Sequence, residues 1–148
     1  MRVHVVAVWV LFGACLQAAE PTRDSVKESR EKMQGVWTAV ELDGAGQHVP
    51  KDTKEFRLLF KEDTVIFDRG GEKKEYRFRL RSAGQQGEID LSPVGGKDEG
   101  PTWRGIYFLS DAHFKLCFHK HNPEKRPSEF SAKIDVGFWR IDCRRPKP

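Results

Sequence analysis

The residues best suited to chemistry gather in one stretch near the C-terminus, which reads His-Phe-Lys-Leu-Cys-Phe-His-Lys-His from His113 to His121. If this stretch is a β-strand, its alternation places Cys117 and His119 on one face and the phenylalanines on the other. Imidazole and thiolate are ligands that zinc and copper accept. However, His121 falls beyond the expected end of the strand, and no carboxylate is placed to orient a ligating imidazole. The favoured interpretation is a polar outer face, and we predict no metal and no other cofactor.

The rest of the chain offers no set of catalytic side chains. No Gly-x-Ser-x-Gly or His-Glu-x-x-His pattern is present, and Ser110-Asp111 is typical of a turn. Glu88 and Asp90 alternate on one face of a short strand, which favours two solvated carboxylates over a paired acid and base. The glycine pairs at 70–71 and 95–96 lack the lysine and the following helix of a phosphate-binding loop. We therefore predict no catalytic residue and a protein that is not an enzyme.

The two cysteines of the C-terminal half, Cys117 and Cys143, would form a disulfide by default in an oxidising compartment. The alternation of side chains along the two strands argues against this disulfide. Trp139 and Ile141 share a face with Cys143, and we expect that face to be inward, whereas Cys117 points outward. Side chains on opposite faces of a wall cannot be bridged without a shift of the backbone, such as a bulge near Gly137. We predict two free thiols.

Short segments of alternating apolar and polar residues make up most of the chain after Gly35. The cleanest is Tyr-Arg-Phe-Arg-Leu-Arg at 76–81, in which apolar and cationic residues alternate strictly. Ten phenylalanines favour strands over helices, and Asp, Gly and Pro residues mark the turns between segments. The pattern predicts strands at 36–42, 55–61, 64–68, 76–81, 88–91, 103–109, 112–119 and 134–143.

A meander of antiparallel strands leaves exposed edges unless it closes on itself. We therefore predict an all-β fold, an eight-stranded antiparallel up-and-down barrel over residues 35–145. A two-sheet sandwich with hairpin connections is the competing architecture. Residues 20–34 are polar and charged, but Val26, Arg30 and Met33 fall on one helical face, so we expect a short helix lying against the barrel.

Residues 1–19 have the composition of a signal peptide. A positive charge stands near the start, residues 3–12 are almost wholly apolar, and cleavage fits after Ala18 or Ala19. The apolar run is too short to span a bilayer as a helix, so we expect a secreted or periplasmic protein. The sequence Leu-Phe-Gly-Ala-Cys that ends at Cys15 also resembles a bacterial lipobox, which leaves a lipid-anchored form as the alternative.

The net charge of +4 does not indicate a nucleic-acid partner. Lys and Arg are interleaved with Asp and Glu along the whole chain, whereas a nucleic-acid-binding protein concentrates its cations on one stripe. We predict no nucleic acid, and no membrane contact unless Cys15 carries a lipid. The oligomeric state is left open.

The segment Met-Gln-Gly-Val-Trp at 33–37 resembles the Leu-Gln-Gly-x-Trp opening of a lipocalin-like family of uncharacterised secreted bacterial proteins, described as a planctomycetal domain family. The resemblance continues, in order, through Leu58-Leu59-Phe60, Glu88-Ile89-Asp90-Leu91, Gly105-Ile106-Tyr107, Leu116-Cys117 and Arg126-Pro127-Ser128-Glu129-Phe130. It implies a small lipocalin-like barrel behind a signal peptide, with no activity established. In lipocalins the Trp of Gly-x-Trp packs at the closed end against an Arg of the last strand. The resemblance therefore implies structural roles for Gly35 and Trp37, with Arg140 or Arg144 as the arginine.

An eight-stranded barrel has an interior just wide enough to be filled by side chains or to hold one small ligand. We expect at most a shallow pocket here, because the inward side chains are bulky. They are Trp37, Phe56, Leu58, Phe60, Phe67, Phe78, Trp103, Tyr107, Phe114 and Phe118.

The long connection between the last two strands carries Arg-Pro-Ser-Glu-Phe at 126–130. Pro127 stiffens the loop, and Phe130 can cap a barrel end. Arg126 can pair with Glu129 or present its guanidinium to an anionic ligand. A motif that only ties the loop to the barrel is the plainer interpretation. The candidate ligand-binding residues are Trp103, Tyr107, Arg126 and Phe130.

Two hypotheses for function follow from these features. The first is a secreted or envelope binding module for a small apolar or anionic ligand at the open end of the barrel. The second is a filled barrel without a small-molecule ligand, which serves as a structural or protein-interaction module of the cell envelope.

Overall fold

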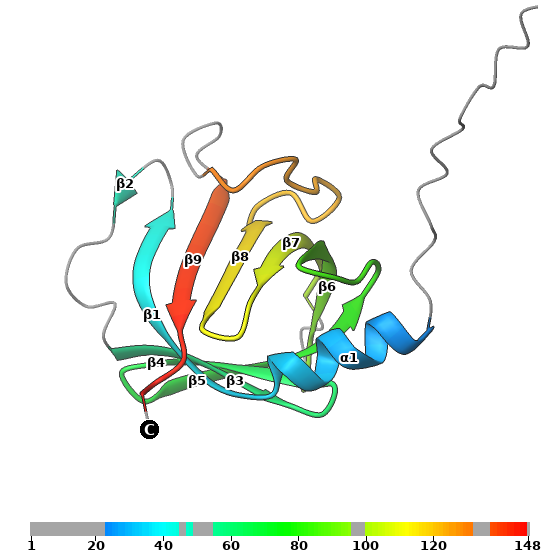
Figure 1. Ribbon diagram of the computed structural model, residues 1–148. Helices are drawn as coiled ribbons and strands as arrows, with labels where there is room; N and C mark the ends of the chain where they lie inside the picture. The colour runs from blue at the N-terminus through cyan, green and yellow to red at the C-terminus, as the bar shows by residue number, and fades with distance from the viewer. Residues whose placement is uncertain (1–22, 45–46, 49–54, 96–99, 132–136, 148) are drawn as a thin grey trace, which may run out of the picture.

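The computed structural model describes residues 23–44, 47–48, 55–95, 100–131 and 137–147. Within these ranges the chain forms one helix, α1 (Arg23–Met33), and otherwise strands and connections (Figure 1). The strands are β1 (Gly35–Gly44), β2 (Gln47–His48), β3 (Phe56–Lys61), β4 (Thr64–Arg69), β5 (Glu72–Leu80), β6 (Gln86–Pro93), β7 (Trp103–Leu109), β8 (His113–His119) and β9 (Phe138–Arg144). The predicted signal peptide at 1–19 and the lipobox at Cys15 lie outside the described residues.

The sheet closes into a barrel because β1 pairs with two partners. Consecutive strands pair antiparallel from β3 to β9, and β1 pairs with both β3 and β9. The part of β1 from Gly35 to Thr38 lies along β3, and the part from Thr38 to Gly44 lies along β9, with a bulge between Ala39 and Glu41. A bulge bends and twists a strand, which allows β1 to pair with β3 along one part and with β9 along the other. The predicted eight-stranded antiparallel barrel with a short N-terminal helix is confirmed.

A few strand ends differ from the prediction. β5 begins at Glu72 and not at 76, because the polar residues before Tyr76 continue the ladder with β4 although they are exposed. β2 was not predicted, since its two residues, which pair with the end of β1, are too few to show alternation. β9 is described from Phe138, and residues 132–136 of the predicted strand lie outside the described ranges. No helix in the described ranges is long and apolar enough to cross a membrane.

The half of the barrel next to α1 is filled by side chains. The ring centroid of Phe60 lies 5.3 Å from that of Phe78 and 5.1 Å from that of Phe114. Trp37 has no exposed surface and packs 5.6 Å from Phe114. Its indole N–H donates a hydrogen bond of 2.7 Å to the carbonyl of Met33, the last residue of α1. The predicted inward residues are all buried except Trp103, which is partly buried against the core.

Arg145 is the arginine that packs on Trp37 at this closed end. Its guanidinium carbon lies 4.2 Å from the Trp37 ring centroid. The guanidinium also donates to the carbonyl of Gln34 at 3.0 Å and to the carbonyl of Lys32 at the end of α1. Gly35 joins α1 to β1 with a φ of +100°, a conformation that a side chain would strain.

The prediction of Arg140 or Arg144 in this role is wrong. In β9 the residues that share the parity of Cys143 face inward, and Arg145 continues that series just past the end of the strand. Arg140 and Arg144 have the opposite parity. Arg140 faces outward, where its guanidinium lies 2.6 Å from the carboxylate of Asp43.

Cys117 and Cys143 are free thiols, as predicted. Cys143 belongs to the core inside the barrel, whereas Cys117 faces outward in β8, opposite Arg140 of β9. Both side chains are buried. Since Cys117 lies on the outer face, another segment must cover it there.

Candidate functional site

The end of the barrel away from α1 holds an open pocket of about 180 Å³. Two of its lining residues, Phe67 of β4 and Phe118 of β8, meet across the barrel, with ring centroids 6.4 Å apart. Its apolar wall comes from alternate residues of strands that are neighbours in the barrel. The wall is formed by Leu42, Phe56, Phe67, Tyr76, Trp103, Phe118, Trp139 and Ile141.

Aromatic rings form a continuous series along this wall. The rings of Trp103 and Phe118 are stacked, with centroids 5.1 Å apart and planes 6° apart. Tyr76 lies 5.0 Å from Trp103 and 4.9 Å from Phe67, which meets Phe56 edge to face at 6.0 Å. Burial raises the pKa of Tyr76, so its hydroxyl stays protonated at neutral pH. The series offers flat apolar surfaces to a ligand.

Charged side chains complete the pocket at its rim. Arg69 and Lys74 continue the inward series of β4 and β5 past the last aromatic residue. The Glu72 carboxylate lies 3.6 Å from the Lys74 ammonium. The Lys120 ammonium, just after β8, lies 5.1 Å from the ring centroid of Trp139. The charged residues that line the pocket are Arg69, Glu72, Lys74 and Lys120.

The volume of the pocket limits what can enter it. An apolar cavity of about 150 Å³ in another protein holds one benzene molecule, and pockets for drug-sized ligands measure roughly 300–1,000 Å³. A pocket of about 180 Å³ that opens to solvent therefore suits one small ring system or a short chain. The predicted combination of a largely filled barrel and a shallow pocket agrees with this geometry.

The four residues predicted as one ligand-binding set do not lie together. Trp103 lines the pocket. Tyr107 lies fully buried in the filled half, where its hydroxyl donates to the carbonyl of Ser82 at 3.1 Å. Arg126 and Phe130 lie on the outer wall. The grouping is wrong for Tyr107, which is inside the filled half, and for Arg126 and Phe130, because the described part of their connection runs along the outside of the barrel.

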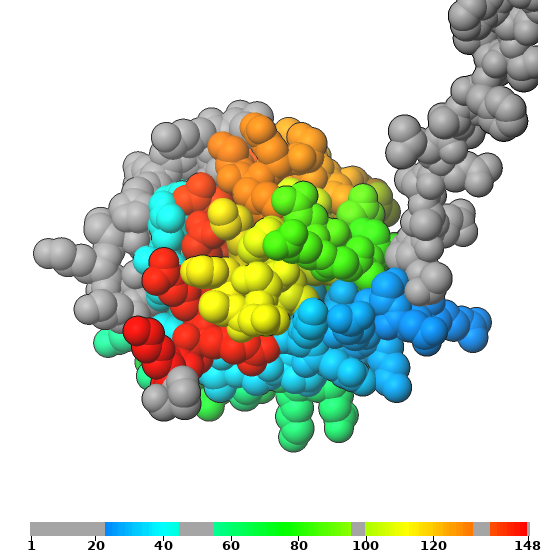
Figure 2. Space-filling model, viewed as in Figure 1, coloured from blue at the N-terminus to red at the C-terminus, as the bar shows by residue number. Residues whose placement is uncertain are grey.

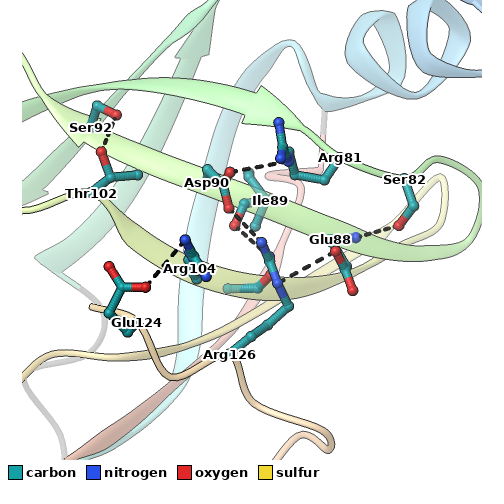
Figure 3. A network of polar contacts seen from close by, with 11 residues as sticks. Arg81, Ser82, Glu88, Ile89, Asp90, Ser92, Thr102, Arg104, Glu124 and Arg126 are labelled. Carbon is teal, nitrogen blue, oxygen red and sulfur yellow. Dashed lines mark hydrogen bonds and ion pairs between the residues drawn. The ribbon is translucent and has the colours of Figure 1, made fainter. Parts of the chain in front are cut away.

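Arg126 is held by the outer wall, as Figure 3 shows. One guanidinium nitrogen lies 2.6 Å from the carboxylate of Asp90, and the Nε atom lies 3.4 Å from that of Glu88. A second nitrogen donates to the carbonyl of Gly105 at 2.5 Å. The side chain is 20% exposed. These partners replace the predicted pair with Glu129 and leave no free guanidinium for an anionic ligand.

Residues 120–131, which we call the strap, lie on the outer surface of the barrel (Figure 2, orange). The Phe130 ring centroid lies 5.7 Å from the ammonium of Lys115 in β8. Ser131 makes a backbone hydrogen bond to the Cys117 thiol, although burial dominates and raises the pKa of this thiol to about 11. The strap therefore covers Cys117 and ties the long connection to the barrel, as the plainer interpretation of its motif predicted.

In the predicted cluster of histidines and cysteine, the His119 side chain makes hydrogen bonds within the protein. The Nδ1 atom of His119 accepts hydrogen bonds from the backbone N–H groups of His121, at 3.2 Å, and Asn122, at 2.8 Å. Its lone pair is therefore occupied at the start of the strap. Across the described ranges, no three side chains of His, Cys, Asp or Glu are grouped closely enough to hold a metal ion.

Replacing Arg126 with methionine is expected to release the strap and speed the alkylation of Cys117 by iodoacetamide at least about ten-fold. The substitution removes the strap's bonds to Asp90 and to the strand carbonyls while keeping a long apolar side chain. Peptide mass spectrometry after timed labelling gives the rate, and Cys143 inside the barrel serves as an internal reference. The matched control is Arg104→Met, which removes one exposed ion pair between β7 and Glu124 of the strap. Equal labelling rates in the two folded variants would contradict the assigned role.

The sequence did not single out most of the pocket. Phe56, Phe67, Phe118 and Trp139 were predicted to face inward but not to form a site, and Tyr76 was placed only on the apolar side of its strand. Strand alternation could have indicated the charged rim. Arg69 lies two residues after the inward Phe67 of β4, and Lys74 lies two residues before the inward Tyr76 of β5. Comparison with models of protein families, with curated proteins and with solved structures gives no match to this chain.

Proposed function

We propose that this protein is a binding protein and not an enzyme, and that one small ligand with a flat apolar body occupies the pocket at the open end. The observation that carries this proposal is the series of aromatic rings around an open pocket in a barrel whose other half is filled. A ring stacked on Trp103 would bury apolar surface, at about 25 cal/mol per Å², and gain roughly 0.5–1.5 kcal/mol from the aromatic contact. The volume favours one ring or two fused rings.

The alternative function, a filled barrel that serves only as a structural or interaction module, has less support because it leaves the aromatic pocket without a role. Export to the periplasm or beyond belongs to our proposal and rests on the leader-like composition of residues 1–19. A relation to the lipocalin-like planctomycetal family is likewise proposed, from the sequence resemblance alone.

Calorimetric titration with a neutral bicyclic probe, 2-naphthamide, tests the proposal. We expect one molecule to bind per chain and to raise the midpoint of thermal unfolding. Trp103→Ala should weaken binding about ten-fold, the equivalent of 1.4 kcal/mol, because the stacking surface is lost. Phe130→Ala removes an aromatic ring from the outer wall and should leave the affinity unchanged. The proposal fails if neither this probe nor smaller neutral aromatic probes bind, or if both variants lose affinity equally.

A further inference from the structure

We infer that the ligand of this pocket is a small amphiphilic anion, an aromatic body that carries one carboxylate. This inference rests on the proposed function and adds the charge and the polar end of the ligand. Two observations support it: the excess of cations at the rim of an apolar pocket, and a buried indole N–H of a pocket-lining residue that has no acceptor among the described residues.

The rim carries an excess of positive charge. Arg69, Lys74 and Lys120 line the pocket, and Glu72 is the one acidic residue among the described residues that line it, which leaves two net positive charges on these four side chains. Glu72 lies 3.6 Å from Lys74, and these two side chains are 73% and 66% exposed, so their ion pair is weak. Arg69 and Lys120 form no ion pair among the described residues. An anion at the rim would therefore meet cations that are not already neutralised.

Two partly buried arginines of the outer wall are matched with carboxylates, whereas the exposed Arg79 of β5, like the exposed Arg69 and Lys120 of the rim, forms no ion pair among the described residues. Arg140 lies 2.6 Å from Asp43, 2.7 Å from Glu41 and 3.0 Å from Asp142. Arg126 is held between two carboxylates of β6 in the same way. The rim differs from the outer wall in where its cations stand, because Arg69, Lys74 and Lys120 have inward parity and border an apolar pocket.

Trp139 provides a second argument for an oxygen-bearing ligand. Its ring lies against the backbone of Gly44 in β1, where an added Cβ would come within 2.6 Å of the ring. Its indole nitrogen is buried and has no acceptor among the described residues. A buried donor without a partner is destabilising, because it has lost its hydrogen bond to water without gaining another. Because this nitrogen is buried, an oxygen of the ligand would accept from it only after the Trp139 ring turns toward the pocket.

The apolar wall and the cationic rim together define the ligand. Inorganic phosphate has charge but no apolar body, so it would leave the aromatic wall in contact with water. A long acyl chain would not fit in about 180 Å³. An aromatic carboxylate fits both parts, with its ring on Trp103 and its charge toward Arg69, Lys74 and Lys120.

A matched series of probes tests the inference by calorimetric titration of the full chain. The probes are 2-naphthoate, 2-naphthamide, 2-naphthylmethylammonium and inorganic phosphate, which differ in charge or lack the ring. We expect naphthoate to bind about ten-fold more tightly than the amide, the ammonium to bind more weakly than the amide, and phosphate not to bind. Raising the ionic strength should reduce the difference between acid and amide.

Substitutions of the rim residues distinguish the effect of their charge on binding from the effect of the shape of the pocket. Arg69→Gln and Lys120→Gln should each lower the affinity for naphthoate about two- to five-fold and leave the affinity for the amide unchanged. Glu72→Gln should raise the affinity for naphthoate, an opposite effect that general loss of structure cannot produce. Arg79→Gln, which removes an exposed cation on the outer face of β5, is the control and should change neither. Trp139→Phe keeps an aromatic ring without the N–H and should weaken naphthoate binding.

The possible outcomes distinguish this inference from the proposed function. If acid and amide bind equally and the rim variants change neither, the ligand is not an anion and the inference fails, while the binding function stands. If no probe binds, both fail. Competition between phosphate and naphthoate would indicate a site for a bare anion and would overturn the amphiphilic ligand. Unchanged naphthoate binding in Trp139→Phe would overturn the contribution of the indole N–H.

Discussion

Replacing Trp37 with alanine is expected to lower the free energy of unfolding by about 3–5 kcal/mol. Trp37 has no exposed surface, packs on Phe114 and donates its indole N–H to the carbonyl of Met33. The substitution therefore opens a cavity at the closed end and removes one contact between α1 and the barrel, the hydrogen bond to Met33. Small domains have a total stability of roughly 5–15 kcal/mol, so this loss is a large share of the whole.

Urea denaturation followed by circular dichroism measures this loss. The control is Val36→Ala on the same strand, where the side chain is 39% exposed and the expected loss is below about 1 kcal/mol. Trp37→Phe keeps a ring in the core and should fall between the two. A Trp37→Ala variant as stable as the control would show that the closed end is not packed around this residue.

Arg145→Ala is expected to destabilise the protein by about 2–3 kcal/mol. The guanidinium lies over the Trp37 ring and donates to the carbonyls of Gln34 and Lys32, so its loss leaves the end of α1 without these donors. The neighbouring Arg144→Ala is the matched control. Arg144 is exposed, and its loss should change stability by less than about 0.5 kcal/mol.

A double-mutant cycle with Trp37→Phe and Arg145→Ala measures how much of this effect passes through the ring. A coupling free energy of about 0.5–1 kcal/mol is expected for a cation over an aromatic face. If Arg144→Ala were the more damaging of the two single substitutions, the assignment of the arginine on Trp37 would be wrong.

The barrel could be predicted because its strands alternate clearly. In β5 the series Tyr76, Phe78 and Leu80 is buried and the arginines between them are exposed, as the sequence indicates. The same parity predicted that Cys117 and Cys143 lie on opposite faces. The arginine on Trp37 was assigned from the resemblance and not from parity, whereas counting by twos from the inward Ile141 and Cys143 leads to Arg145.

The candidate site was harder to predict than the fold. Trp103 was identified because it is a large aromatic residue of inward parity. Arg126 and Phe130 belong to the strap, and alternation within strands carries no information about which wall a long connection will cross. The ion pairs that hold Arg126 join it to Asp90 and Glu88, which are far away in sequence. Only the three-dimensional arrangement of β6, β7 and the strap reveals them.

The pairing of β1 with both β3 and β9 affects the order in which the strands of the barrel pair during folding. The other strand pairs of the barrel join strands that are close along the chain, and those with short loops, such as β3–β4, β4–β5 and β7–β8, form quickly. The seam between β1 and β9 instead joins the two ends of the meander, and Arg145 meets Gln34 across a sequence separation of 111 residues. The entropy lost on closing so long a loop grows only with the logarithm of its length. Seam formation is therefore expected as the late, rate-limiting event of folding, and it costs only modestly more than joining the ends of a chain half as long.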